Sequence, residues 1–180
     1  QSGARGFYKG DLAQAMARDV QDKGGYLSAE DLAGYKAWMG AAQPVNYRDA
    51  QFHVMPGLTA GPTFARVMEQ LEGADLSTPA ATYVAYVRAL DRAYAERLGK
   101  MGDDGEVPEA PGCTTHCSVV DRDGNMVTHT QTLLSIFGSR VVSPATGFLM
   151  NNGIMWFDPE QGRPNSLAPN KACLMNVCPV

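Results

Sequence analysis

Thr114 is the residue of this chain whose type and position could support covalent chemistry. It begins the β-rich segment TTHCSVV, directly after residues 102–112, whose Gly, Pro and acidic residues are typical of an exposed connector. A threonine hydroxyl is a weak nucleophile unless a base lies beside it, and the α-amine of an N-terminal threonine can be that base. Cutting the peptide bond before Thr114 would create that amine. The position also suits an ordinary strand entrance, because many strands begin with Thr-Thr.

Other kinds of site fit less well. Cys113, His116 and Cys117 lie close together, and His129 lies on the next expected strand. The spacing matches no common zinc pattern, and strand alternation directs His116 and Cys117 to opposite faces. A Ser/His/Asp triad built from this segment would need neighbouring strand residues to converge. The motifs of α/β-hydrolases, dinucleotide-binding proteins and P-loop enzymes do not occur. We expect neither a metal nor a cofactor.

Composition narrows the partners. The 180 residues are 44% hydrophobic and 19% charged, which is typical of a globular domain, with a net charge of −4. Lys and Arg form no run, so the electrostatic footprint of a nucleic-acid-binding protein is missing. No apolar stretch reaches the length of a membrane span. We expect neither nucleic acid nor a membrane as a partner. The four cysteines look like free thiols, which favours the cytoplasm slightly over the periplasm and leaves the location open.

Helical periodicity dominates the chain before residue 102. Ser28 followed by Asp31 is a capping box at a helix start, and Thr78 with Pro79 is a second helix-start signal. The second of these helices runs to about residue 98 and carries an apolar stripe that we expect in the core: Tyr83, Val87, Leu90 and Tyr94. The stretch NYRDAQFHVMP predicts one strand. Helices followed by a hairpin predict an α+β fold.

Several sequence blocks together resemble one family. TTHCSVVDRDGNMVTHTQTLLSIFGS followed by TGFLMNNGIMWFDPEQGRPNSLAPNK is similar to the start of the small subunit of γ-glutamyltransferases (γ-glutamyltranspeptidases, glutathione hydrolases). The upstream FYKGDLAQAMARDVQDKGGYLSAEDLAGYKA resembles the end of that family's large subunit. The likeness covers nearly the whole chain. Within the family, the sequence most resembles a divergent branch that is related to amidohydrolases and acylases. It implies part of an N-terminal nucleophile hydrolase fold, an αββα sandwich.

The resemblance also implies self-cleavage between Cys113 and Thr114. Residues 1–113 would be the mostly helical C-terminal part of the large subunit, and residues 114–180 the β-rich N-terminal part of the small subunit, together one incomplete domain. Thr114 would be the nucleophile, and Thr132 matches a family threonine whose hydroxyl supports it. The remaining segments of both subunits would be partners of this chain, and a small-molecule amide would be its substrate.

The geometry of the expected hairpin decides whether Thr114 and Thr132 can meet. Asp-Gly between two β-branched segments predicts the hairpin turn. A three-residue loop at 123–125 places Thr114 opposite Leu134, with Thr132 as a diagonal neighbour on the same face. A two-residue loop puts Thr132 on the other face. The functional interpretation therefore requires three loop residues, with Gly124 or the residue after it in the left-handed conformation.

The positions that hold the substrate in the family are altered here. The resemblance points to four candidate substrate contacts: Asn151, Asn152, Trp156 and Asn176. The two neighbouring asparagines suit a turn nearly as well, and Trp156 suits a core aromatic equally well. Trp156 stands where family members have an Asp for the substrate's α-amino group, and Met175-Asn176 replaces two serines that hold its α-carboxylate. Loss of these polar anchors weakens the case for a γ-glutamyl head group.

The sequence leaves three functions open. The first is a self-cleaving threonine amidohydrolase that hydrolyses or transfers a γ-glutamyl or related acyl group from an amide such as glutathione. The second is an acylase for a non-glutamyl substrate, and the third is an inactive relative that keeps the fold as a scaffold or binding module. The family's Gly-Gly oxyanion segment is expected after residue 180 and its substrate-binding arginine before residue 1. We therefore expect a central fragment that is not a competent enzyme by itself.

Overall fold

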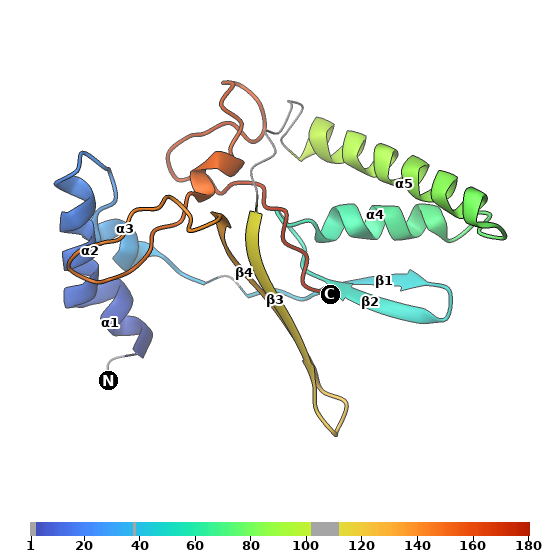
Figure 1. Ribbon diagram of the computed structural model, residues 1–180, viewed down its shortest axis with the longest axis horizontal. Helices are drawn as coiled ribbons and strands as arrows, with labels where there is room; N and C mark the ends of the chain where they lie inside the picture. Colours follow the sequence, from blue (N-terminus) through green and yellow to red (C-terminus); the bar gives the residue numbers. More distant parts are fainter. Residues whose placement is uncertain (1–2, 38, 102–111) are drawn as a thin grey trace. The chain divides into compact units, whose positions relative to one another are not determined.

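The computed structural model describes residues 3–37, 39–101 and 112–180, so most of the expected connector lies outside the described residues (Figure 1). Its elements, in chain order, are α1 (Gly3–Lys9), α2 (Asp11–Gln21), α3 (Ala29–Gly34), β1 (Gln43–Tyr47), β2 (Ala50–Val54), α4 (Gly61–Leu71), α5 (Pro79–Lys100), β3 (Gly112–Val120), β4 (Met126–Ser135) and a 3-10 helix (Gly153–Trp156). Among the described residues, no helix combines the length and apolarity that a membrane crossing requires.

The chain divides into two compact units. Of the described residues, 3–37, 39–40, 112–113 and 133–152 belong to one unit, and 41–101, 114–132 and 153–180 belong to the other. The second unit therefore contains α4, α5, most of the β3–β4 hairpin and the C-terminal segment. It also contains the residues that the sequence analysis assigned to the nucleophile and its support.

Both predicted helix starts are confirmed. The Ser28 hydroxyl accepts the amide of Asp31 at 3.1 Å, and the Asp31 carboxylate accepts the amide of Ser28 at 2.9 Å, which completes the capping box before α3. The Thr78 hydroxyl accepts the amide of Ala81 at 3.2 Å, and Pro79 occupies the first turn of α5. Each cap thus satisfies a backbone amide in the first turn of its helix.

The single strand predicted over residues 46–56 is wrong, because the chain turns within it. Arg48 takes a left-handed φ of 54°, and β1 pairs with β2 in an antiparallel register that joins Tyr47 to Ala50. Val45 and Val54, both almost fully buried, lie with α4 in a small apolar core. The turn carries no Gly, so its signal was hidden by the flanking β-formers.

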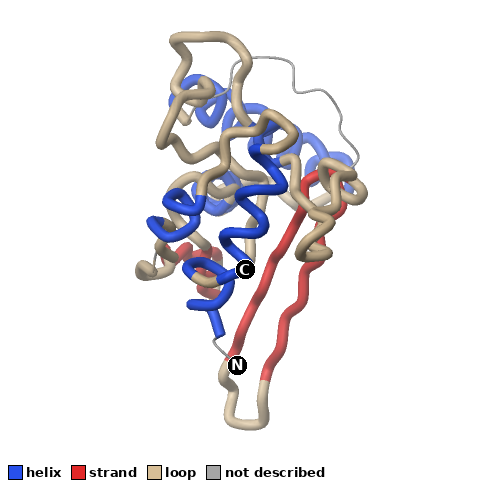
Figure 2. Tube along the Cα trace, turned by 90° about the vertical axis from the view of Figure 1, so that its left-hand side faces the viewer, coloured by secondary structure: helices blue, strands red, loops and turns tan. Residues whose placement is uncertain are grey.

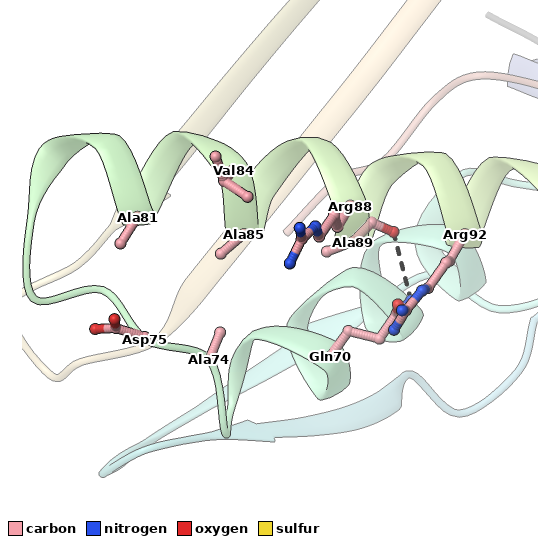
Figure 3. A pocket seen from close by; sticks show the side chains of 9 residues that line it. All are labelled: Gln70, Ala74, Asp75, Ala81, Val84, Ala85, Arg88, Ala89 and Arg92. Atoms are coloured by element: carbon pink, nitrogen blue, oxygen red, sulfur yellow. Dashed lines mark hydrogen bonds between the residues drawn. The ribbon is translucent and has the colours of Figure 1, made fainter.

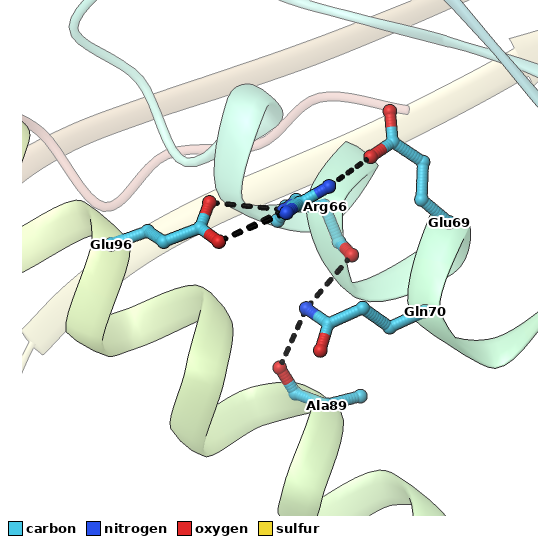
Figure 4. Close-up of polar contacts among 5 residues, drawn as sticks. All are labelled: Arg66, Glu69, Gln70, Ala89 and Glu96. Atoms are coloured by element: carbon cyan, nitrogen blue, oxygen red, sulfur yellow. Dashed lines mark hydrogen bonds and ion pairs between the residues drawn. The ribbon is translucent and has the colours of Figure 1, made fainter.

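Helix α5 packs on α4 through a face other than the predicted one. The apolar stripe is largely solvent-exposed, with Tyr83 70% and Val87 66% accessible, whereas Ala89 and Ala93 are buried. Small side chains on this face allow the two helices to approach closely. Polar contacts bridge them: Arg66 of α4 pairs with Glu96 of α5 at 3.0 Å, and Gln70 donates to the Ala89 carbonyl (Figure 4). The expected burial of the stripe is therefore wrong for the described residues.

In the other unit, helix α2 holds the loop that follows β4. The Asp19 carboxylate accepts the Ser143 hydroxyl at 2.5 Å and the Ala145 amide at 3.0 Å. These two hydrogen bonds, with that from Ser143 the stronger influence, lower the pKa of Asp19 below its ordinary value. The ring of Phe7 in α1 meets Phe148 edge to face, with 5.3 Å between the ring centroids. These contacts hold the loop at residues 143–148.

Candidate active site

Strands β3 and β4 form a long two-stranded hairpin (Figure 2). The Asp121 amide donates to the Asn125 carbonyl at 3.0 Å, and the Gly124 amide donates to the Asp121 carbonyl at 3.2 Å. Gly124 has a φ of 83°, as the functional interpretation required. The loop therefore has three residues, at 122–124, and combines a tight turn with a left-handed glycine.

The loop lies one residue earlier than predicted, and this shift corrects the register. The Asp121 carboxylate accepts the amides of Asp123 and Asn125, each at 2.9 Å, and these bonds start the turn at Asp121. As a result Thr114 lies beside Thr132 and not opposite Leu134. The residue of β4 that lies beside Thr114 therefore changes by two positions, and because side chains alternate along a strand, the same face of β4 is kept.

Thr114 and Thr132 form the candidate catalytic pair. Their Oγ1 atoms lie 3.1 Å apart, with the Thr114 hydroxyl donating to Thr132. Hydroxyls rotate, so either group can donate as the charge on its neighbour changes. Thr114 is exposed and Thr132 is half-buried. A nucleophile reachable by a substrate, with a fixed hydroxyl beside it, suits attack on a carbonyl.

His116 extends the polar face of the hairpin. Its Nδ1 lies 2.8 Å from the Thr130 hydroxyl, and its Nε2 lies 3.0 Å from the Ser118 hydroxyl. Both ring nitrogens are thus engaged with hydroxyl groups. Within the described part of the chain, no group of three or more His, Cys, Asp or Glu residues is placed to hold a metal ion.

The cysteines in the described residues carry free thiols, as expected: Cys117, Cys173 and Cys178. The side chain of Cys113 lies outside the described residues. Burial raises the pKa of the Cys173 and Cys178 thiols, which leaves less thiolate at neutral pH. These two cysteines are therefore poor candidates for nucleophiles.

Asn165 joins two segments that the sequence analysis placed at the substrate. It is 4% exposed, its Nδ2 donates to the Trp156 carbonyl at 2.6 Å, and its Oδ1 accepts the Leu174 amide at 2.9 Å. Trp156 itself ends the short 3-10 helix and is half-buried. Sequence reasoning gave Asn165 no role of its own, and its only signal was an asparagine after a proline.

Arg97, near the C-terminal end of α5, holds the candidate substrate residue Asn176. The residue is 4% exposed, and its guanidinium donates to the Asn176 Oδ1 at 2.9 Å and to the Met175 carbonyl at 3.1 Å. On its other side it donates to the Thr59 carbonyl at 2.9 Å and to the Thr63 hydroxyl at 3.1 Å. The sequence gave no sign of this cluster, because a helical arginine is usually solvated.

The other two candidate substrate contacts lie in the other unit. Asn151 is exposed. The amide group of Asn152 is used within the protein: its Oδ1 accepts the Ser135 amide at 3.0 Å, and its Nδ2 donates to the Ser135 hydroxyl at 2.8 Å. Next to it, the Met150 carbonyl accepts both the amide and the hydroxyl of Ser139, each at 2.9 Å. The two segments that carry the F-G-S and N-N motifs are therefore hydrogen-bonded to each other.

A separate cavity of about 340 Å³ lies along α4 and α5 (Figure 3). The exposed guanidinium groups of Arg88 and Arg92, on successive turns of α5, line it together with Gln70 and Asp75. The rest of its lining consists of alanines and one valine. None of the predicted site residues contributes to it.

Comparisons with known proteins identify the family of this chain. The sequence profile described as Gamma-glutamyltranspeptidase matches residues 1–111 and 105–180. The chain is 29% identical to the glutathione hydrolase proenzyme of Escherichia coli K12, over 99% of this chain and 40% of that protein. It is 27% identical to the acylase ACY 1 proenzyme of Pseudomonas sp. strain V22, over 99% of this chain and 39% of that protein. The chain thus spans about 40% of the length of these relatives.

Solved structures give the fold. Cephalosporin acylase from Bacillus halodurans superposes on this chain with a TM-score of 0.85 and 24% identity, and the match covers 97% of this chain and 38% of the acylase chain. Helicobacter pylori gamma-glutamyltranspeptidase covers 56% of this chain and 30% of its own, with a TM-score of 0.51 and 31% identity. The predicted fold class, an α+β part of an N-terminal nucleophile hydrolase, is confirmed. Because the family profile extends over the whole of its length, this chain belongs to the γ-glutamyltranspeptidase family.

Proposed function

We propose that this chain is the central part of a threonine amidohydrolase that cleaves itself before Thr114 and then hydrolyses an acyl amide. The observation that carries the proposal is the 3.1 Å contact between the Thr114 and Thr132 hydroxyls, at the start of β3. A second hydroxyl in this position stabilises charge that develops on the attacking oxygen. Membership of a family of hydrolases and acylases supports the same chemistry.

Self-cleavage uses the same oxygen as turnover. The Thr114 hydroxyl adds to the carbonyl carbon of Cys113, and the C–N bond of that peptide breaks. The acyl group now sits on the Thr114 oxygen as an ester, and the nitrogen becomes a free α-amine. Water opens the ester, leaving a carboxylate on Cys113 and restoring the hydroxyl of Thr114. The new amine is the base that the mature nucleophile needs.

Turnover repeats these steps on a substrate amide. The Thr114 oxygen attacks the amide carbonyl while the α-amine takes its proton, and the leaving amine departs with that proton. Water, or an acceptor amine, then releases the acyl group from the ester. The Thr132 hydroxyl hydrogen-bonds to the reacting oxygen throughout, because both residues are fixed in one register of the hairpin. We propose hydrolysis as the main outcome.

Trp156 and Asn176 are proposed contacts of the acyl group. A half-buried indole at Trp156 offers no counter-charge to an α-ammonium group, and the Trp156 carbonyl is already engaged by Asn165. An acyl group with a carboxylate or carbonyl but no α-ammonium therefore fits better than γ-glutamyl. The acylases among the relatives favour a non-glutamyl acyl group, whereas the glutathione hydrolases favour a γ-glutamyl group.

Self-cleavage tests the reaction. The full parent chain is purified as wild type, Thr114→Ala and Thr114→Ser, and each is followed by intact mass. We expect the wild type to yield a fragment that begins at Thr114, the alanine variant to stay whole, and the serine variant to cut more slowly. A wild type that remains one polypeptide would leave the scaffold alternative as the better account.

Substrate preference is tested with two chromogenic amides that differ in one group. γ-Glutamyl-p-nitroanilide carries the α-ammonium group, and glutaryl-p-nitroanilide lacks it. We expect kcat/KM to be higher for the glutaryl compound, since nothing proposed at the site balances the ammonium charge. A preference for the γ-glutamyl compound of tenfold or more would instead support a glutathione hydrolase.

A further inference from the structure

The buried guanidinium of Arg97 links three segments that are far apart in the sequence. It donates to Thr59 and Thr63 at the start of α4, and to Met175 and Asn176 in the C-terminal segment. Four of its donor positions are used in one fixed fork. Arg97 is therefore an anchor between α5, α4 and the segment that carries Asn176.

The C-terminal segment has other attachments at the same place. The Met175 amide donates to the Leu58 carbonyl at 2.7 Å, and the Ala60 amide donates to the Val177 carbonyl at 2.9 Å. These backbone bonds hold the segment beside residues 58–60 without Arg97. The guanidinium thus sets the finer placement of Met175 and Asn176, and does not alone decide whether the segment docks.

The contact also fixes the orientation of the Asn176 amide. A guanidinium only donates hydrogen bonds, so the atom 2.9 Å from its Nη2 must be the amide oxygen. The Asn176 Nδ2 is then turned away from Arg97. Asn176 is an exposed residue, so this donor is accessible to a ligand. Without Arg97, the amide could present either its oxygen or its nitrogen.

We propose that Arg97 is a positioning residue for substrate recognition: it orients Asn176 so that Nδ2 donates to an acceptor oxygen on the acyl group. The chemical class selected is an acyl group with a carboxylate or carbonyl oxygen beyond the scissile amide. Arg97 itself does not touch the substrate. This inference rests on the proposed amidohydrolase function and on Asn176 lying at its substrate site.

A double-mutant cycle in the full parent enzyme tests the inference. The variants are Arg97→Lys, Asn176→Ala and the two combined, with glutaryl-p-nitroanilide as substrate. Lysine keeps the charge but cannot supply the two-sided fork. We expect Arg97→Lys alone to raise KM about tenfold, the size of one well-placed hydrogen bond, with kcat changed less than threefold. In the Asn176→Ala background the same change should raise KM less than twofold.

A merely structural role for Arg97 predicts a different result. In that case Arg97→Lys would have the same effect in both backgrounds, and this outcome would overturn the inference. Arg92→Lys, on the same helix but in the separate cavity, is the matched control and should leave KM unchanged.

A second variant covers the case in which Arg97→Lys fails to fold. Asn176→Asp keeps an acceptor for Arg97 but removes the Nδ2 donor, so KM should rise at least tenfold while thermal stability is maintained. An unchanged KM in Asn176→Asp would also overturn the inference.

Self-cleavage of the same preparations distinguishes failure of the proposed function from failure of the role of Arg97. If the wild type cuts at Thr114 and hydrolyses the substrate, but the effects of Arg97→Lys and Asn176→Ala on KM are independent, only the role of Arg97 is refuted. Wild type that neither cuts nor turns over would refute the proposed function, and the inference with it.

Discussion

Thr132→Val keeps the shape of the side chain and removes its hydroxyl, and with it the hydrogen bond from Thr114. Thr114 is exposed, and water can replace the lost partner in the resting protein. We therefore expect a loss of only about 0.5–1.5 kcal/mol in the free energy of unfolding, the net value of a typical hydrogen bond. The effect on the reaction should be larger, because charge develops on the Thr114 oxygen during attack.

The expected rate follows from the strength of a charge-assisted bond. A hydrogen bond to a charged group contributes about 1.5–3 kcal/mol, and each 1.4 kcal/mol corresponds to a factor of ten in rate. Thr132→Val should therefore slow both self-cleavage and acyl-enzyme formation by about 10- to 150-fold, within that range of free energy. Time-resolved intact mass measures the first rate, and rapid quenching of a single turnover measures the second.

Thr128→Val is the matched control for this experiment. Thr128 lies on the same half-buried face of β4 and has no hydrogen bond to Thr114. We expect the control to react at the wild-type rate. If Thr132→Val and Thr128→Val slow the two steps equally, the Thr132 hydroxyl has no special role and the reasoning from the 3.1 Å contact is wrong.

Three further predictions concern the hairpin and its surroundings. Gly138→Ala should destabilise the fold by about 2 kcal/mol or more, because a Cβ there would lie 2.4 Å from the Met150 carbonyl oxygen at a φ of 53°. Gly147→Ala is the control: it has a φ of 72° and open space around it, so it should cost only about 1 kcal/mol, and denaturant unfolding measures both variants. The hydrogen bonds from Asn125 lower the pKa of Asp121, so the charged carboxylate stabilises the turn above the ordinary carboxyl pKa of about 3.9. The turn should loosen as pH falls below that value, seen as lower protection factors of the loop amides, and protection factors that do not change with pH would contradict this. Iodoacetamide should modify Cys117, which is exposed, before the other two described thiols, and peptide mapping that finds the reverse order would refute it.

Local signals in the sequence predicted the helix starts well. The Ser28 and Thr78 caps need only residues within one turn, so a short stretch of sequence is enough to recognise them. For the face of β4 that Thr114 meets, the sequence left two alternatives, because an Asp-Gly turn suits a loop of two or three residues. The start of that loop was missed by one residue, since the Asp121 side chain competes for the turn amides.

Tertiary packing decided what the sequence could not. Periodicity finds an apolar stripe on α5, but it cannot say which face meets α4, and the close approach selected Ala89 and Ala93. The roles of Arg97 and Asn165 depend on partners up to 79 residues away, so no local pattern announces them. Trp156 and Asn176 were identified by resemblance alone, and their contacts with substrate stay predictions.

The most direct test of the central claim combines cleavage and catalysis in one measurement. The mature parent enzyme is reacted with glutaryl-p-nitroanilide, quenched in acid during turnover, digested and mapped by mass spectrometry. We expect a peptide whose first residue is Thr114 and which carries the mass of one glutaryl group. An uncut peptide that runs through Cys113 and Thr114, or an acyl group on a different residue, would contradict it.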